Sequence, residues 1–379
     1  MRANLLTDGG GPRRRFNPSD LQALLAVPRA PGRREPRVCL AGKLTALAAP
    51  GGGEVQLAAM ARRLPAAGVA ARLWRPWEDA LGEFDCLHLF GSLPEHLELV
   101  RAAQRAKVPV ALSTIAWFDV GSVWRQPRWL GFRLTATAKY LARAAVPRMP
   151  SWRRKLYHAV DLLLPNSQAE AEQLIRYFGV PQSKIHVVPN GADERFGEAA
   201  AADFARLAGG RGFVLYAGRI EPRKNQLNFL RAMRGTDAPI VVLGDVVPGH
   251  DDYLARCRRA AGEHVRFVGQ LRHDDPLLSS AYAACGCLAL CSWFETPGLV
   301  ALEAGMSGVP LVLPARGCAR EYFGGWADYV EPGDLRGIRQ KVLAALQKPR
   351  SATLAGIVRR RYSWSAAAEA TREAYETIL

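Results

Sequence analysis

Short apolar runs alternate with helical patterns along most of the chain, and the alternation occurs twice. The apolar runs of the first half are RVCLAG, VAARLW, FDCLHLF, VPVALST and DLLLPNS. After the alanine-rich stretch 192–210, the pattern starts again with GFVLYAG, APIVVLGD, EHVRFVGQ, GCLALCS and GVPLVLP. Such runs are typical of strands that are buried on both faces, and the segments between them are typical of the helices of βαβ units. The pattern predicts an α/β protein with two doubly wound, Rossmann-like domains facing a central cleft.

The same pattern divides the chain into four segments. Residues 1–36 are rich in Gly, Pro and Arg, and we expect a flexible basic arm there. We place the first Rossmann-like domain at 37–192 and the second at 193–362. The last segment, 363–379, has the pattern of an amphipathic helix with a serine cap, and such a helix can cross back to the first domain.

The residues that directly follow the strands are the candidates for chemistry, because ligands of open parallel sheets bind beyond the carboxyl ends of the strands. In LYAGRIEPRKNQ, Gly218, Arg219 and Lys224 follow a strand at the point where a helix opens. Glycine lets a ligand approach the backbone, and two cations beside a helix N-terminus suit a diphosphate. For either cation taken alone, a solvated surface charge is the alternative interpretation.

A second candidate lies in FETPGLVALEAGMSGVP, where Pro297 suits the first turn of a helix. Glu295 and Glu303 are eight residues apart, and at about 100° per residue the second side chain returns to within about 80° of the first. Both carboxylates can therefore face one cleft, although two unrelated surface acids are the alternative. Gly298 and Leu299 would offer backbone N–H groups to a ligand at the same helix start.

A third candidate is VGQL, residues 268–271, which also follows the pattern of a strand end. Its backbone, from Val268 onward, is suited to line a planar base. An ordinary strand end explains the segment equally well.

The composition narrows the class of protein. With 379 residues, 49% of them hydrophobic, the chain is long enough for two domains. No run approaches the roughly 18 apolar residues of a spanning helix, and the N-terminal segment lacks the apolar core of a signal peptide, so we expect a cytoplasmic protein. The seven cysteines are an odd number and stand mostly in apolar runs, which implies no disulfide framework. No Cys and His residues have the spacing of a metal site, so we expect neither a metal nor another cofactor.

The positive charge is concentrated in the first half of the chain. The formal net charge is +16, and residues 1–195 hold 28 Lys+Arg against 16 Asp+Glu. This asymmetry indicates an anionic partner of the first domain. Nucleic acid is one such partner, but the sequence has no helix-turn-helix, zinc-finger or RNP signature, so we do not expect it to bind.

One stretch combines this charge with aromatic residues. Between Asp119 and Asp161 there is no acid, while nine cations alternate with six aromatic residues, and Arg153, Arg154 and Lys155 form its densest group. Cations interleaved with rings suit an anionic bilayer, where each cation contributes about 1 kcal/mol and the rings lie at headgroup depth. The stretch predicts docking on a membrane, and a solvated arginine-rich face is the alternative.

Four segments of the chain resemble glycosyltransferase family 4, whose members are retaining enzymes of the GT-B fold. Together they extend the resemblance over about residues 37–379, in the order that the family shows, which makes it far more specific than any single motif. The segments are GGGEVQLAAMARRL (51–64), LLPNSQAEAEQLIRYFGVPQSKIHVVPNGAD (163–193), VLYAGRIEPRKNQ (214–226) and FETPGLVALEAGMSGVPLV (294–312).

The resemblance implies a role for each candidate residue of the second domain. Arg219 and Lys224 would hold the diphosphate of a nucleotide-sugar donor. Glu303 would bind the ribose hydroxyls, and Glu295 would face the transferred sugar. Fixed cations and helix amides can stabilise a leaving diphosphate without a metal, and the sequence has no D-x-D pair to carry one.

The resemblance also implies an acceptor side, on which the loop with Gly52 and Gly53 would approach the donor phosphates and the acceptor. The expected enzyme is a retaining hexosyltransferase that moves a hexose, for example mannose, from a GDP- or UDP-sugar. Its expected acceptor is a lipid-linked glycan of surface polysaccharide synthesis at the inner face of the membrane. A small soluble acceptor is the alternative, and a basic nucleic-acid-binding protein is the alternative outside enzymes.

The chain departs from the family pattern near the reacting sugar. Many members have a histidine after the strand that corresponds to PVALST, where this chain has Ala116 and Trp117. Many also have an aromatic residue where this chain has Pro297. His88, at the end of FDCLHLF, is close to the expected cleft by topology, and we interpret it as a structural residue. Whether Trp117 or His88 compensates for the absent histidine stays open, as do the donor base, the sugar, the linkage and the oligomeric state.

Overall fold

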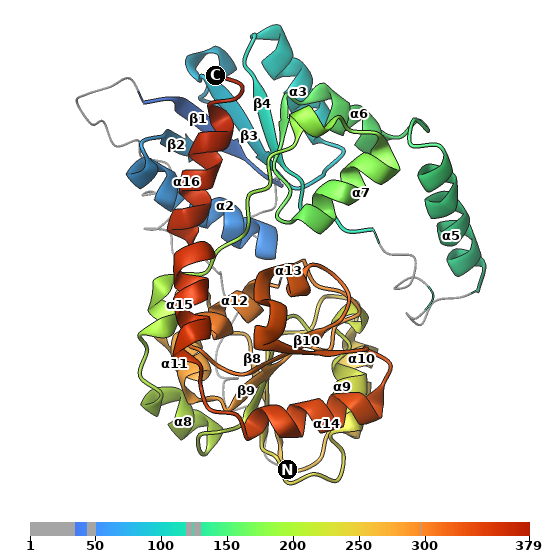
Figure 1. Cartoon of the computed structure of the whole chain (residues 1–379), viewed down its shortest axis with the longest axis vertical. Helices are drawn as coiled ribbons and strands as arrows, with labels where there is room; N and C mark the ends of the chain where they lie inside the picture. Colours follow the sequence, from blue (N-terminus) through green and yellow to red (C-terminus); the bar gives the residue numbers. More distant parts are fainter. Residues whose placement is uncertain (1–34, 44–50, 119–123, 125–129, 297) are drawn as a thin grey trace. The chain divides into compact units, whose positions relative to one another are not determined.

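The computed structural model spans the chain and describes residues 35–43, 51–118, 124, 130–296 and 298–379 (Figure 1). The chain divides into two compact units. The second unit contains Ala192–Arg361, and the first contains the described residues up to 118 together with Leu130–Gly191 and Tyr362–Leu379. Nearly all of the predicted basic arm and Pro297 lie outside the described residues.

The first unit contains a parallel sheet with the order β2-β1-β3-β4-β5 among its described residues. Its strands are β1 (Arg37–Ala41), β2 (Ala70–Leu73), β3 (Cys86–Phe90), β4 (Val110–Ser113) and β5 (Leu162–Leu163). Its helices are α2 (Gly52–Arg63), α3 (His96–Arg105), α5 (Leu130–Ala145), α6 (Trp152–Ala159), α7 (Gln168–Phe178) and α16 (Trp364–Tyr375).

The second unit contains a parallel sheet with the order β11-β10-β9-β6-β7-β8. Its strands are β6 (Val214–Ala217), β7 (Ile240–Leu243), β8 (Val265–Gly269), β9 (Cys287–Ala289), β10 (Leu311–Pro314) and β11 (Ala327–Val330). Its helices are α8 (Ala202–Ala208), α9 (Gln226–Ala232), α10 (Asp251–Ala260), α11 (Pro276–Ala284), α12 (Leu299–Met306), α13 (Ala319–Phe323), α14 (Leu335–Leu346) and α15 (Ala352–Arg361).

Most strands of both sheets are short, apolar and covered on both faces, whereas β8, at the edge of the second sheet, is partly exposed. Every residue of β3, β4, β6, β7, β9 and β10 is buried. Near-continuous apolar runs of this kind are required where helices cover both faces of a parallel sheet, because neither side of the strand meets water. The two parallel sheets predicted from the sequence are therefore confirmed, whereas the predicted cleft between the domains stays a prediction.

The C-terminal helix α16 belongs to the first unit, although it follows the second unit in sequence. The hydroxyl of Ser363 caps it by accepting a hydrogen bond from the N–H of Ala366 (3.2 Å). Helix α16 packs against α2 and against the short turn Leu64–Ala67 that follows α2 (Figure 1). Near its end, the hydroxyl of Tyr375 lies 2.7 Å from Nδ1 of His88 on β3. The chain thus returns to its first sheet through both helix packing and a buried polar contact.

No helix among the described residues combines the length and the apolar character needed to cross a bilayer.

Candidate functional site

The carboxyl ends of β6 and β9 meet where the strand order of the second sheet changes direction. From β6, the sheet extends through β7 and β8 on one side and through β9, β10 and β11 on the other. Loops that leave two neighbouring strands at such a point diverge, and the crevice between them is the usual ligand site of an open parallel sheet. Gly218, Arg219 and Lys224 lie on the loop after β6, and Glu295 lies on the loop after β9.

The loop after β6 begins with a close backbone contact between Gly218 and Gly244, which follows β7. A Cβ built on Gly244 would lie 2.1 Å from the carbonyl oxygen of Gly218, and Gly244 has a φ of 142°. The N–H of Gly218 donates to the carbonyl of Leu243, and the N–H of Gly244 donates to that of Gly269, both at 2.8 Å. Only glycine fits at position 244, because backbone atoms occupy the place of a side chain. The ends of β6, β7 and β8 therefore present closely packed backbone at the site.

Val268, the residue predicted to line a base, lies in β8 beside Gly269, at the end of the sheet order. Its side chain is partly buried. The next residue after the strand, Gln270, donates its N–H to Oδ1 of Asp245 at 3.1 Å, which ties this strand end to the loop after β7. The backbone of the segment is thus ordered next to the site, and its contact with a base stays a prediction.

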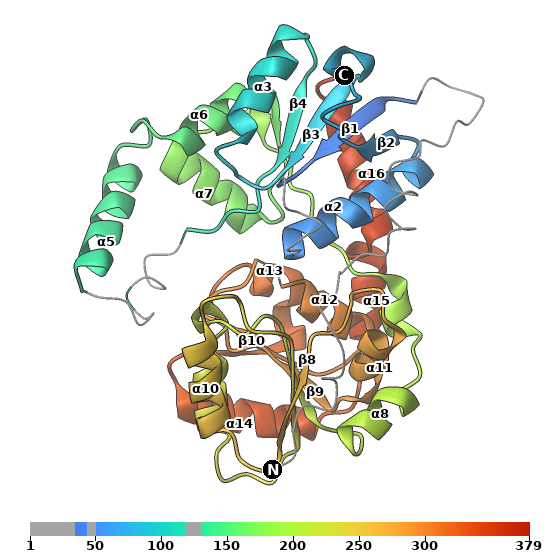
Figure 2. The ribbon, with the colours of Figure 1, turned by 180° about the vertical axis from the view of Figure 1, so that it is seen from behind.

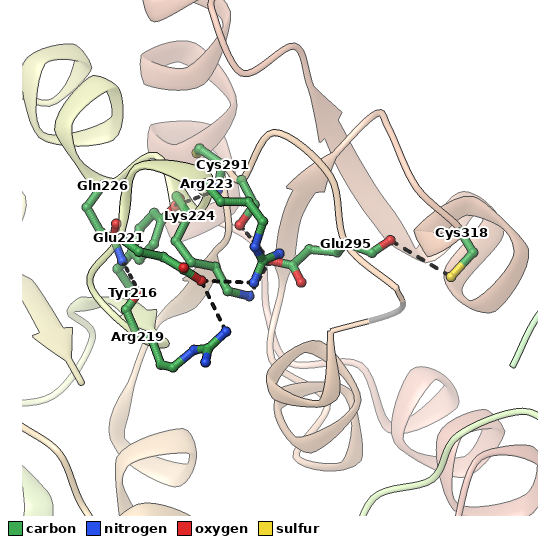
Figure 3. A network of polar contacts seen from close by, with 10 residues as sticks. Tyr216, Arg219, Glu221, Arg223, Lys224, Gln226, Cys291, Glu295 and Cys318 are labelled. Carbon is green, nitrogen blue, oxygen red and sulfur yellow. Dashed lines mark hydrogen bonds and ion pairs between the residues drawn. The ribbon is translucent and has the colours of Figure 1, made fainter. Parts of the chain in front are cut away.

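An ion pair joins the two loops at the centre of the site (Figure 3). Nζ of Lys224 lies 2.6 Å from Oε1 of Glu295, and the side chains are only 13% and 5% exposed. The hydroxyl of Ser292 donates to the same carboxylate oxygen at 2.5 Å. Burial lowers the pKa of Lys224, and the charge of Glu295 opposes this shift. Burial also works against the charge of Glu295, but the nearby Lys224 and Arg223 outweigh it and lower the pKa of the carboxyl group.

Tyr216 and Asn225 hold the two loops in register behind the ion pair. The hydroxyl of Tyr216, a residue of β6, donates to the carbonyl of Lys224 and accepts from the N–H of Cys291 at 3.0 Å. Asn225 has a left-handed φ of 62°, and its side-chain amide donates to the carbonyls of Cys291 and Pro332, both at 2.8 Å. Both side chains are buried. Their bonds cross from the β6 loop to the β9 loop, so the position of Lys224 is set from two directions.

Arg219 and Arg223 place two further cations beside Lys224, and both turn toward Glu221 (Figure 3). Their guanidinium groups lie 3.3 and 3.0 Å from Oε1 of Glu221. The Arg219 side chain is 46% exposed, so its guanidinium can reach a ligand. The carbonyl of Arg219 accepts from the side-chain amide of Gln226 at 2.8 Å, which fixes the backbone of the loop.

The backbone of Glu295 is bound to the loop after β10. Glu295 and Gly317 form an isolated parallel bridge, and the N–H of Cys318 donates to the carbonyl of Glu295 at 3.2 Å. A Cβ on Gly298, the residue before α12, would lie 3.3 Å from Oε2 of Glu295. Helix α12 begins at Leu299. The second oxygen of Glu295 therefore lies next to the N-terminus of α12. That Glu295 and Glu303 face one cleft stays a prediction.

Glu303 lies inside α12 and is 5% exposed. Its two carboxylate oxygens have separate partners: the hydroxyl of Tyr282 donates to Oε2 at 2.5 Å, and Nε2 of His273 lies 3.1 Å from Oε1. Tyr282 is fully buried in α11, and the ring of His273 packs edge-on against Phe196 at 5.7 Å. Glu303 is thus oriented from two elements that lie 21 and 30 residues before it in the sequence.

In the first unit, Gly52 and Gly53 begin α2 after a gap in the described residues. The N–H of Gly51 donates to Oε2 of Glu54 at 2.6 Å, which closes the first turn. A Cβ on Gly53 would lie 3.2 Å from Cδ1 of Ile115. Ile115 has a φ of 45°, a conformation in which a β-branched residue is strained. The glycine turn therefore packs against the strained loop after β4.

Glu170 holds this strained loop in place from α7. Its carboxylate accepts hydrogen bonds from Oγ1 of Thr114 (2.5 Å), the N–H of Ala116 (2.7 Å) and the N–H of Asn166 (2.9 Å). Burial raises the pKa of Glu170 to about 7, although these three hydrogen bonds oppose the shift. Thr114 and Ala116 flank Ile115, so one carboxylate binds the side-chain hydroxyl before the strained residue and the backbone N–H after it.

His88 and Trp117, the two residues considered for the position of the absent family histidine, have different surroundings. His88 is 1% exposed, and its Nε2 lies 2.9 Å from Oγ of Ser113 while Nδ1 lies near Tyr375. Its ring stacks on Phe90 with a centroid distance of 4.2 Å, and burial lowers the pKa of His88 to about 3. A neutral histidine with both nitrogens engaged fits a structural role in the core. Trp117 is only partly buried.

The three cations predicted to meet a membrane lie together on α6, but they are not equally accessible. Lys155 is exposed, whereas Arg153 and Arg154 are partly buried. The guanidinium carbon of Arg153 lies 4.3 Å from the ring centroid of Trp152 and 5.6 Å from that of Phe118. Arg153 therefore packs within its own unit through cation–π contacts.

Sequence reasoning missed the residues that orient the candidate groups. They are Tyr216, Asn225, His273, Tyr282 and Ser292 in the second unit, and Glu170 in the first. A usable signal existed for two of them: Glu170 is the last residue of the capping box in SQAE, and Ser292 lies three residues before Glu295. Tyr216 and Asn225 lie near Lys224 in the sequence, but their bonds to Cys291 span 75 and 66 residues. His273 and Tyr282 lie 30 and 21 residues from Glu303.

Two family models match the chain: Glycosyltransferase Family 4 over residues 50–196, and Glycosyl transferases group 1 over residues 201–361. A glycogen synthase of Mycobacterium tuberculosis is 30% identical over 80% of this chain and 69% of its own length. The chain belongs to glycosyltransferase family 4, as the resemblance predicts. A D-inositol 3-phosphate glycosyltransferase of Catenulispora acidiphila is also 30% identical, over 58% of this chain, and the chain spans only 57% of that relative.

Solved structures agree with the predicted fold class. Anabaena Alr3699/HepE, crystallised in complex with UDP and glucose, superposes with a TM-score of 0.65 at 19% identity, over 90% of this chain and 100% of that one. A sucrose-phosphate synthase from Thermosynechococcus elongatus gives the same TM-score at 17% identity, over 90% of this chain and 98% of that one. At these identities the likeness concerns the fold alone. The predicted GT-B fold class is confirmed.

Proposed function

We propose that the chain is a retaining, metal-independent hexosyltransferase that uses a UDP- or GDP-sugar. The observation that carries the proposal is the buried ion pair between Lys224 and Glu295, which spans the point where the strand order of the second sheet reverses. Ligands bind at such points, and here the ion pair places one cation and one carboxylate within a single site. A diphosphate would meet Lys224, while the sugar attached to it would meet Glu295.

The charges of the site suit the departure of a diphosphate. As the bond to the sugar breaks, negative charge grows on the leaving phosphate, and fixed cations stabilise that charge without reorganising. Lys224 is held rigidly by Glu295, and Arg219 stands half-exposed next to it. The backbone N–H groups at Gly298 and Leu299 add the positive end of α12. Retention follows if the leaving phosphate accepts the proton of the acceptor on the same face of the sugar.

Glu303 suits the ribose of the donor. Each carboxylate oxygen has more than one acceptor position, so Glu303 can keep Tyr282 and His273 and still accept hydrogen bonds from two ribose hydroxyls. Because the buried Tyr282 and the partly buried His273 both hold the carboxylate, it is fixed before the donor binds, which reduces the entropic cost of binding. A structural neighbour supports a nucleotide-sugar, because Anabaena Alr3699/HepE was crystallised with UDP and glucose and also with UDP-glucose.

We further propose that the acceptor is a lipid-linked glycan and that the protein works at the inner, cytoplasmic face of an anionic membrane. The support is the acid-free stretch between Asp119 and Asp161, which combines cations with aromatic residues. A role in surface polysaccharide synthesis follows from such an acceptor. A small soluble acceptor is the second candidate, and the D-inositol 3-phosphate glycosyltransferases among the relatives favour it.

Thermal shift with UDP, GDP and their sugars tests the donor. A ligand present at about 100 times its dissociation constant stabilises the protein by about 2.7 kcal/mol, so the correct base and sugar should give the largest shift. Glu303→Ala should weaken the binding of the free nucleotide and of the nucleotide-sugar to the same extent, because both ligands contain the ribose. Glu295→Gln should leave the binding of the free nucleotide unchanged and weaken only the binding of the nucleotide-sugar. Gln keeps the shape of the side chain and a partner for Ser292.

Glu198→Gln is the matched control for these variants, because Glu198 belongs to the same unit and its side chain is 66% exposed. It should leave both ligands unchanged. Equal losses for both ligands in the Glu295 variant would contradict the proposed division of roles, as would a loss confined to the nucleotide-sugar in the Glu303 variant. The absence of any shift with all nucleotides and nucleotide-sugars would contradict the donor class itself.

A further inference from the structure

The main chain of Glu295 is held by the segment that follows β10, residues 315–318, which we call the β10 loop. Glu295 and Gly317 form an isolated parallel bridge outside the sheet. The N–H of Glu295 donates to the carbonyl of Arg316 at 3.5 Å, and Sγ of Cys318 lies 3.9 Å from the carbonyl of Glu295 (Figure 3). The helices that follow the two loops, α12 and α13, lie side by side in both views of the second unit (Figures 1 and 2). The β10 loop therefore adjoins the site from a third strand.

The bridge leaves no room for a side chain at position 317. A Cβ built on Gly317 would lie 2.0 Å from the carbonyl oxygen of Glu295 and 2.8 Å from its nitrogen. Real Cβ atoms essentially never come closer than 3.0 Å to such neighbours. Gly317 also has a φ of 100°, a conformation that residues with a side chain rarely adopt. Glycine is therefore what allows the two backbones to meet.

The far side of the β10 loop is anchored to β11 and to the residue that follows it. The N–H of Ala315 donates to the carbonyl of Val330 at 2.9 Å, and Nε of Arg316 lies 3.4 Å from Oε2 of Glu331. These contacts fix the loop from the side opposite to the bridge. A side chain inside the bridge would therefore move the main chain of Glu295.

The two carboxylate oxygens of Glu295 have different surroundings. Oε1 lies 2.6 Å from Nζ of Lys224 and accepts from the hydroxyl of Ser292 at 2.5 Å. Among the described residues, no hydrogen bond reaches Oε2, which lies 3.3 Å from the place of a Cβ on Gly298. A hydroxyl group of a bound sugar can therefore donate to Oε2. Because Oε1 is held by its partners, the position of Oε2 depends on where the main chain of Glu295 lies.

We propose that Gly317 is a positioning residue of the transfer reaction: by admitting the backbone of Glu295 to the bridge, it places Oε2 at a hydroxyl group of the donor sugar. The inference rests on the proposed function for the identity of the ligand. Gly317 acts through Glu295 and not by contact with the donor. The nucleotide part of the donor meets other residues, so the effect of Gly317 is confined to the sugar.

Gly317→Ala in the full chain tests the inference by isothermal titration calorimetry with UDP, GDP, UDP-glucose and GDP-mannose. The nucleotide-sugar that the parent prefers should bind to the variant more weakly by on the order of ten-fold or more, because the charged acceptor of a hydrogen bond is displaced. The affinity for the matching free nucleotide should stay unchanged, because this ligand lacks the sugar. A variant that only disturbed the fold would weaken both ligands.

Gly249→Ala is the matched control. Gly249 lies in the same unit and has a φ of 84°, but a Cβ there meets no atom within 4 Å. This variant therefore introduces comparable backbone strain without a collision, and it should bind both ligands like the parent.

If Gly317→Ala does not fold, hydrogen exchange of the parent takes its place. The N–H of Cys318, which donates to the carbonyl of Glu295 at 3.2 Å, should exchange more slowly with the nucleotide-sugar than with the free nucleotide. A sugar bound to Oε2 holds Glu295 in the bridge and so protects this N–H. Equal protection by the two ligands contradicts the inference.

A double-mutant cycle in urea tests the link to Glu295 without any ligand. Gly317→Ala and Lys224→Ala both disturb the surroundings of Glu295, so together they should destabilise the protein by less than the sum of their separate effects. Gly249→Ala and Lys224→Ala should be additive, because a Cβ on Gly249 meets no neighbour.

Each outcome decides the inference. Equal affinities of Gly317→Ala and the parent for the nucleotide-sugar overturn it, and so does an equal loss for the free nucleotide. Additive effects of Gly317→Ala and Lys224→Ala on stability also overturn it, because Gly317 then does not act on Glu295. If the parent binds no nucleotide-sugar but the cycle is not additive, the proposed function fails while the positioning of Glu295 by Gly317 stands. If the parent binds a nucleotide-sugar and Gly317→Ala binds it equally well, the positioning role fails alone.

Discussion

At the scale of single residues, the site is organised by the partners of its charged groups. Lys224 and Glu295 come from loops 71 residues apart and meet in a buried pair. Removing one partner of such a pair leaves an uncompensated buried charge, which typically costs about 3–5 kcal/mol. Any single substitution at this pair therefore changes both the stability and the chemistry of the site. The effect on stability and the effect on turnover therefore have to be separated by comparing single and double variants.

Lys224→Ala should lower turnover by on the order of 10²-fold or more, because it removes a fixed cation from the leaving diphosphate. It should also destabilise the second unit, because Glu295 remains buried and charged. The double variant Lys224→Ala/Glu295→Gln should recover much of the stability without recovering turnover. Steady-state kinetics and urea denaturation measure the two quantities.

Arg231→Ala serves as the control for Lys224, since Arg231 is an exposed cation of α9 in the same unit. It should retain full turnover and stability. If Lys224→Ala keeps full activity, the residue is not part of the diphosphate site. If the double variant regains turnover together with stability, the role of Lys224 is structural.

At the scale of elements, the return of the chain to the first unit depends on a backbone crossing at Gly191. A Cβ built there would lie 2.4 Å from the carbonyl carbon of Ser363 and from the N–H nitrogen of Trp364. The segment before the second unit and the segment before α16 therefore touch through their backbones. Residues of the helix itself, such as Tyr375, then reach β3.

Gly191→Ala should destabilise the first unit by about 1–3 kcal/mol, because the added methyl group meets backbone atoms that cannot rotate away. Urea denaturation measures the loss. Gly82→Ala is the matched control, because a Cβ there meets no atom within 4 Å. Equal stability of the two variants would show that the crossing can relax at little cost.

At the scale of the whole molecule, two buried groups of the first unit give opposite contributions to the pH dependence of stability. The pKa of His88 is lowered from 6.5 to about 3. Between these two pH values, the unfolded chain binds a proton at this residue and the folded chain does not. This contribution makes stability rise with pH between about 3 and 6.5. The pKa of Glu170 is raised from 4.5 to about 7, so the folded chain keeps a proton that the unfolded chain releases. This contribution makes stability fall with rising pH between about 4.5 and 7.

Glu170→Gln removes the opposing contribution of Glu170, so the contribution of His88 to the pH dependence of stability should become measurable. Between pH 4.5 and 6.5, the free energy of unfolding of this variant should rise with pH relative to Glu172→Gln, by at most about 1.4 kcal/mol per pH unit. Glu172 is an exposed neighbour on α7, which makes it the matched control. Denaturation series across this range supply the comparison. Parallel curves for the two variants would mean that Glu170 titrates as an ordinary carboxyl group.

Local sequence patterns predicted ten of the eleven strands among the described residues, but not β11 (Ala327–Val330), and they also named the main candidate residues of the site. Apolar runs predict buried strands, because a strand covered on both faces has no polar side. Gly218, Arg219 and Lys224 are recognisable because they follow such a run, and the segment around Glu295 and Glu303 because it opens a helix. Each of these signals extends over fewer than about a dozen residues, so periodicity and strand-end position can reveal it.

Only the tertiary structure decided what those residues contact. Glu295 is neutralised by Lys224 from another loop, Glu303 is oriented by Tyr282 and His273, and Arg153 packs against rings although its sequence neighbours suggest a free charge. The exposure of Leu130, Leu134 and Leu141 on α5 was also decided by the tertiary structure, because a helical pattern shows that one side is apolar but not whether another element covers it. Hydrogen bonds, burial and exposure depend on which distant segments meet. That is fixed by the packing of the whole chain and not by the order of neighbouring residues.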